Sequence, residues 1–303
     1  MMRPRPLLKS ALASCLLAAA VGAHAHDTWF HPHASARPGE ILLALGTGNQ
    51  FPVQEYPVGA ADLRQSGCGA GDDKPVALSA VRDTPTALIV HATMKSAALT
   101  CWAQLAPFDI ELTADKVKLY LKEINAPQAT HEAWSRMQAR GVVWKERYTK
   151  HARIELRNGS QVSRMQPKAV GMGMDVLLES GLQAIHPGDP LVFQVLRDGA
   201  PLPDFAVELR SDQHRLGIWR KTDAQGRVRI AAPLVGKWVL RGTDLRLSES
   251  APDTWESRFV TLAFEITPAA SQNGNTLKLN TRSESHVPAI ATITRDPPTK
   301  TSF

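Results

Sequence analysis

The chain has only three cysteines, and no two of them form a Cys-x-x-Cys pair. The spacing that is typical of thiol redox motifs and of thiolate zinc sites is therefore absent. The sequence also lacks the Gly-x-Ser-x-Gly turn of α/β-hydrolases and the His-Glu-x-x-His helix of zinc proteases. No paired-carboxylate motif can be placed either. Together these absences predict that the protein is not an enzyme.

Long apolar runs are absent after residue 25, and the one that precedes it is short. Residues 1–25 combine the basic start MMRPRPLLK, the apolar stretch ALASCLLAAAVGA and the small residues of Ala23-His24-Ala25. This is the pattern of a secretory signal peptide, and the stretch is shorter than the roughly 20 residues that cross a bilayer. We predict cleavage after Ala25 and a periplasmic, non-membrane-spanning protein. A cut after Ala23 and a lipobox at LASC (12–15) are the alternatives.

Strong charge of one sign is also missing. Removal of residues 1–25 takes away three of the 35 basic residues and lowers the formal net charge from +6 to +3. Such a charge does not indicate a nucleic-acid partner.

Removal of residues 1–25 also removes Cys15, so that Cys68 and Cys101 remain as an even pair in an oxidising compartment. We predict that they form a disulfide.

Over the whole chain, short apolar runs are broken by 21 prolines and 20 glycines, which favours β-structure. The predicted fold is mainly β, with two β-sandwich domains of the immunoglobulin-like or transthyretin-like kind. We place the N-terminal sandwich at 26–165, the C-terminal sandwich at 170–268 and a flexible tail at 269–303. Helical spacing predicts an insert at about 113–150 in the first domain, with these residues on its apolar faces: Val117, Tyr120, Leu121, Ile124, Trp134, Met137, Trp144 and Tyr148.

Four of the ten histidines lie in the segment HAHDTWFHPH, residues 24–33. If the mature chain starts at His26, its α-amine and imidazole can chelate one divalent metal. Nitrogen ligands of this type suit Ni(II), Co(II), Cu(II) or Zn(II). The alternative is a solvated, frayed chain end.

Further ligands are needed to complete such a site. On an extended segment the side chains of His31 and His33 share a face with Trp29, whereas the side chain of His26, at an even-numbered position, points to the opposite face. A bent strand or a distant histidine is therefore required. We take His91 as the fourth candidate ligand, beside these alternatives: His131, His151 and His186.

Several segments, among them HDTWF, ERYTKHARIEL, TDAQGRVRIAAPL and GKWVLRG, follow one another in a specific order. Over about residues 26–267 this order resembles a periplasmic family of unknown function associated with nickel and cobalt uptake, whose members are called NikK-like or NikM-like. The TDAQGR and LVGKWVLRG segments resemble a transthyretin-like or Cna B-type module. The resemblance implies an exported two-domain β-protein that binds a transition metal or assists a transporter. In this sequence, only His26, Asp27 and Trp29 match positions of the family pattern.

Two classes of function follow. The first is a periplasmic accessory protein that binds nickel, cobalt or copper as its cofactor or cargo and contacts a membrane transporter component. In this class Asp27 is expected to hydrogen-bond a ligating imidazole or the terminus, and Trp29 to anchor the strand. The second is a non-catalytic recognition or adhesion module of the cell envelope. An oxidative copper enzyme with an N-terminal histidine brace is a third alternative.

Overall fold

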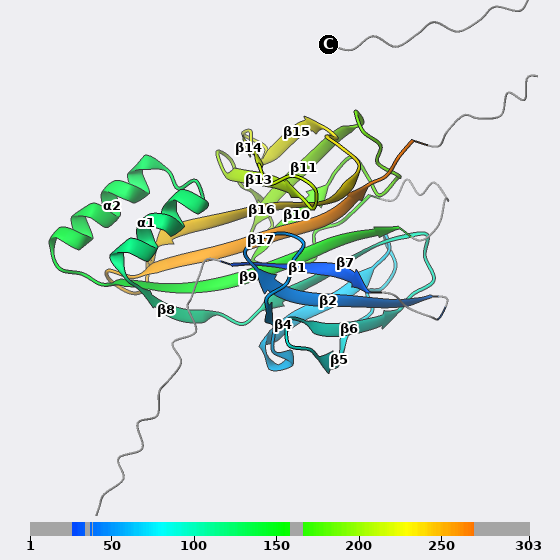
Figure 1. The fold of residues 1–303 in the computed structure, drawn as a ribbon, viewed down its shortest axis with the longest axis horizontal. Helices are drawn as coiled ribbons and strands as arrows, with labels where there is room; N and C mark the ends of the chain where they lie inside the picture. Colours follow the sequence, from blue (N-terminus) through cyan, green and yellow to red (C-terminus); the bar gives the residue numbers. More distant parts are fainter. Residues whose placement is uncertain (1–25, 34–36, 38, 158–165, 270–303) are drawn as a thin grey trace, which may run out of the picture. The chain divides into compact units, whose positions relative to one another are not determined.

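The computed structural model describes residues 26–33, 37, 39–157 and 166–269 (Figure 1). The predicted signal peptide lies outside the described residues, and so does the predicted tail from residue 270 on. The described chain is mainly β, with several sheets and two short helices, which confirms the predicted fold class. Neither of these helices is long and apolar enough to cross a membrane.

The strands of the described residues form three sheets. The N-terminal sheet has the order β1-β2-β6-β5, with β3 paired to β2. Its strands are β1 (Asp27–His33), β2 (Glu40–Gly48), β3 (Tyr56–Pro57), β5 (Ser79–Asp83) and β6 (Leu88–Thr93). In the C-terminal sheet β11 pairs with β10, β12 and β15. Its strands are β10 (Met174–Leu178), β11 (Pro190–Arg197), β12 (Ala200–Pro201) and β15 (Arg227–Ala231).

The central sheet lies between these two, with the order β14-β13-β16-β17-β9-β7-β4 and with β8 paired to β9. From the first half of the chain come β4 (Leu63–Gly69), β7 (Ala98–Leu105), β8 (Phe108–Leu112) and β9 (Trp144–Arg157). From the second half come β13 (Ala206–Ser211), β14 (Ile218–Lys221), β16 (Gly236–Leu247) and β17 (Trp255–Ile266). The two halves meet where β9 and β17 pair in parallel, side by side in Figure 1. The predicted domain boundary stays a prediction.

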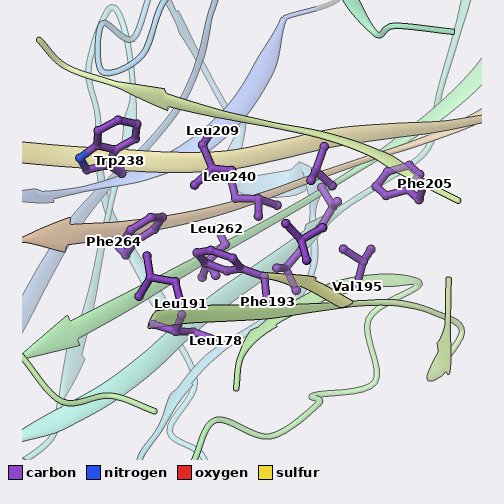
Figure 2. Packing of buried hydrophobic residues seen from close by; sticks show 14 of the residues in the cluster. Leu178, Leu191, Phe193, Val195, Phe205, Leu209, Trp238, Leu240, Leu262 and Phe264 are labelled. Carbon is purple, nitrogen blue, oxygen red and sulfur yellow. The ribbon is translucent and has the colours of Figure 1, made fainter. Parts of the chain in front are cut away.

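The central sheet is covered on both faces. Val260, Leu262 and Phe264 of β17 pack against the C-terminal sheet, whereas Ala263 packs with residues of the N-terminal sheet. Because consecutive strand residues point to opposite faces, the two outer sheets lie on opposite sides of β17. Figure 2 shows the C-terminal core, in which Leu262 and Phe264 meet Phe193 of β11.

The helical insert consists of α1 (Ala114–Glu123) and α2 (Gln128–Ala139), and a short 3-10 turn, Ala60–Asp62, precedes β4. The insert buries its apolar faces against aromatic side chains of the central sheet, such as Trp144 and Trp255. Trp144 and Tyr148 belong to β9, so the predicted continuation of the second helix through them is wrong. Gly141, with φ +77°, adopts the left-handed conformation that ends helices, and two β-branched valines follow it.

The predicted disulfide between Cys68 and Cys101 is confirmed, and it joins paired positions of β4 and β7. The sequence separation of 33 residues sets its effect on the unfolded chain. For the double variant Cys68→Ala/Cys101→Ala, the free energy of unfolding is expected to be about 3–4 kcal/mol lower than for the wild type. Denaturant unfolding measures this difference, and the wild type under reducing conditions is the control. A variant that unfolds at the wild-type midpoint contradicts the expectation.

Candidate functional site

Strand β1 runs along the face of the central sheet, and its odd-numbered side chains meet β16 in order. Asp27 contacts Arg241, and Trp29 packs with Val239. Further along, Nε2 of His31 lies 3.4 Å from Nζ of Lys237. The strand is also fixed through its backbone, because Thr261 Oγ1 donates a hydrogen bond of 2.6 Å to the carbonyl of Thr28. The first residues of β1 are therefore held in place over the central sheet.

His26 directly precedes this strand. The residue is only 5% exposed. Its ring stacks on the ring of Tyr56 in β3, with 5.1 Å between centroids and 19° between planes. This stacking restricts the orientation of the imidazole at the start of β1.

Asp27 is engaged by a buried arginine. Nη1 of Arg241 donates to Asp27 Oδ2 at 2.6 Å, and Nε donates to Glu208 Oε2 at 2.7 Å. Nη2 donates to the carbonyl of Glu123 at the end of α1, at 3.1 Å. Burial acts to lower the pKa of Arg241, but the two carboxylates outweigh it and raise that pKa above its ordinary value. Asp27 thus anchors β1, and its expected hydrogen bond to a ligating imidazole stays a prediction.

Lys150 of β9 is a residue that sequence reasoning missed. Its Nζ lies 5.3 Å from the ring centroid of Tyr148 and 6.0 Å from that of Phe259. Burial lowers the pKa of Lys150 to about 8, against the opposing effect of the Asp27 carboxylate. Alternation along ERYTKHARIEL places Lys150 on the face of β9 that carries Tyr148, but no local pattern reveals that this face meets β1.

His31, His33 and His91 lie toward the other end of β1. His33 pairs with Leu42 of β2, and Leu42 pairs with His91 of β6, so the two histidines lie two strands apart, about 10 Å. Nε2 of His91 lies 3.4 Å from Oε1 of Glu40. His26 is about 16 Å along the strand from His31.

The four candidate ligands therefore do not converge on one site. Within residues 26–33, 37, 39–157 and 166–269, no three His, Cys, Asp or Glu side chains are grouped as metal ligands. The metal-ligand roles of all four histidines stay predictions. Two alternative histidines are hydrogen-bonded instead, since Nδ1 of His151 pairs with the carbonyl of Phe259 and Nδ1 of His186 with that of Thr267.

The environment of His31 shifts the pKa of its imidazole. Burial lowers its pKa, the cation of Lys237 and the neighbouring His33 lower it further, and Asp212 acts in the opposite direction. The imidazole is therefore neutral near pH 7, and its Nε2 accepts the contact from Lys237 Nζ.

The buried His151 predicts a pH dependence of stability. Burial lowers its pKa from 6.5 to about 4, so the unfolded chain takes up a proton in this range before the folded chain does. Stability should fall as the pH drops from about 6.5 to about 4, by about 3 kcal/mol from this residue. Denaturant unfolding at pH 7 and pH 4 should show a smaller fall for His151→Gln than for the wild type. The exposed His214→Gln is the control, and equal falls in all three proteins contradict the assignment.

The fold defines a mainly β protein in which a central sheet carries a helical insert and one small sheet on each face. The chain belongs to the DUF4198 family: the family model described as "Domain of unknown function (DUF4198)" matches residues 23–243. A search of curated proteins finds no match. The family match carries no link to nickel or cobalt uptake or to a transthyretin-like module.

Proposed function

We propose that this DUF4198 protein is an exported periplasmic protein that binds a divalent transition metal, nickel, cobalt or copper, at the mature N-terminus. Its role is an accessory one in the uptake or handling of that metal. The observation that carries the proposal is the position of His26, with its imidazole stacked on Tyr56 at the start of an anchored strand. Cleavage after Ala25 places a free α-amine on the same residue.

The two nitrogens of His26 suit the proposed metals. An amine and an imidazole on one residue close a chelate ring, and both are nitrogen donors that bind nickel, cobalt and copper well. The stacking on Tyr56 and the Asp27–Arg241 ion pair restrict the terminus before the metal arrives. Less conformational freedom is then lost on binding, which favours affinity.

A chelate from one residue also suits an accessory role. His26 fills two coordination positions, which leaves the others for water or for a donor group of the membrane component that receives the metal. Exchange of these outer ligands permits transfer from one protein to the next. Because ligand nitrogens must be unprotonated, affinity should fall as the pH is lowered.

Calorimetric titration with Ni(II), Co(II) and Cu(II) tests the proposal on protein that begins at His26. One extra residue before His26 converts the amine to an amide and should weaken binding by roughly a hundredfold or more, as should His26→Ala. The exposed His214→Ala serves as the matched control, and binding to it should not change. Unchanged affinity in the extended protein contradicts the site. Absence of binding to all three metals favours the recognition or adhesion module instead.

A further inference from the structure

A cavity of about 200 Å³ lies beside β1, at the end of the strand remote from His26. Its polar groups include His31 of β1 and Lys237 of β16. The apolar lining includes Phe51, Ile154, Leu156 and Ala263. The space equals that of roughly seven water molecules, which is smaller than the cavities that hold drug-sized ligands.

We propose that this cavity binds a small monocarboxylate with an apolar body, and that the carboxylate is held between Lys237 and His31. This site is separate from the metal site proposed at His26. The ligand class follows from three properties of the cavity: an amine without a carboxylate ion-pair partner among the described residues, an imidazole nitrogen 3.4 Å from it, and an apolar floor.

The amine of Lys237 is the first property. Nζ lies 3.4 Å from His31 Nε2, and among the described residues no carboxylate lies within ion-pair distance of it. Glu265 occupies the paired position on β17, yet it forms no ion pair with Lys237. A half-buried cation that faces an imidazole gains more from a carboxylate oxygen, because charge-assisted hydrogen bonds are the stronger ones.

The imidazole of His31 is the second property. Its Nε2 lies at the cavity beside Lys237 Nζ, and in the tautomer that carries the proton there this nitrogen is a hydrogen-bond donor. One oxygen of the ligand would then accept from Lys237 Nζ and the other from His31 Nε2. The titratable and charged groups around the ring and the cavity are Lys237, His33, Asp212, Glu265, Arg157 and Glu155, of which Glu155 is paired with Arg153.

The apolar floor and the neighbouring charges limit the ligand further. Ile154 and Ala263 are paired positions of β9 and β17 and belong to the buried core below the cavity. Both guanidinium NH₂ groups of Arg157 are engaged by carbonyls, those of Gln183 and Glu265. One available amine near the Glu265 carboxylate favours a single negative charge over a phosphate dianion, and the floor favours a hydrocarbon body.

Benzoate is a suitable probe, with benzyl alcohol as its uncharged counterpart and acetate as the head group without a body. NMR titration of the full mature chain should show saturable shifts of the His31 ring signals with benzoate. Benzyl alcohol and acetate should bind about tenfold more weakly or worse. This comparison uses only the wild type and does not depend on the folding of a variant.

Lys237→Met removes the charge and keeps an apolar stem, and it should weaken benzoate binding by about tenfold or more. The exposed Lys145→Met is the matched control and should bind as the wild type does. His26→Ala should also retain benzoate binding, which separates this site from the metal site. Equal benzoate affinity in Lys237→Met and the wild type, or no shift of His31 at tens of millimolar benzoate, overturns the proposal.

Discussion

Replacement of Arg153 by methionine is expected to lower the free energy of unfolding by about 3–5 kcal/mol. The Arg153 side chain is 0% exposed and pairs with Glu155 at 3.0 Å and with Asp175 at 2.9 Å, both almost fully buried. Its Nη2 also donates to the carbonyl of Lys168 at 3.1 Å. The substitution leaves two carboxylates without their cation in a region that water does not reach. Denaturant unfolding measures the loss.

Arg147 offers a matched control on the same strand. It pairs with Asp109 at 2.8 Å, but the two side chains are 59% and 68% exposed. Arg147→Met should therefore lower the free energy of unfolding far less than Arg153→Met does. Similar losses in the two variants would show that the buried network around Arg153 does not hold β9 to β10.

Arg241→Met is expected to have a comparable effect, also about 3–5 kcal/mol, since it leaves Asp27 as a buried carboxylate without its cation and leaves Glu208 with Arg210 as its remaining ion-pair partner. It should also weaken metal binding at His26, because Asp27 no longer anchors the start of β1. Denaturant unfolding and metal calorimetry on the same preparation measure both effects. The control is Arg246→Met, on the same strand, whose side chain is 50% exposed in its pair with Asp244. Wild-type stability in Arg241→Met contradicts this account of the site.

Local patterns in the sequence predict the elements of this fold well. The alternation in FVTLAFEI predicts β17, and the two cysteines that remain beyond residue 25 predict the disulfide that the structure contains. The helical spacing around Trp134 predicts α2, but it also includes Trp144, where the chain has already become a strand. Aromatic residues at helical spacing suit both structures, and only Gly141 marks the change.

Contacts between distant segments escape this type of reasoning. Asp27 and Arg241 are separated by 214 residues, and nothing in either local pattern indicates that they pair. The same holds for His31 and Lys237, which are 206 residues apart. Histidine clustering in the sequence suggests one site, yet an extended strand spreads His26 and His31 over several residue spacings. The position of a candidate ligand thus depends on packing between sheets, which a single sequence does not encode in any short motif.

Electron paramagnetic resonance of Cu(II) bound to protein that begins at His26 tests the proposed metal site most directly. The account predicts nitrogen hyperfine structure that changes when histidine is labelled with ¹⁵N and that is lost or altered when one residue precedes His26. A spectrum that is identical in the native and extended proteins would contradict coordination by the N-terminal histidine.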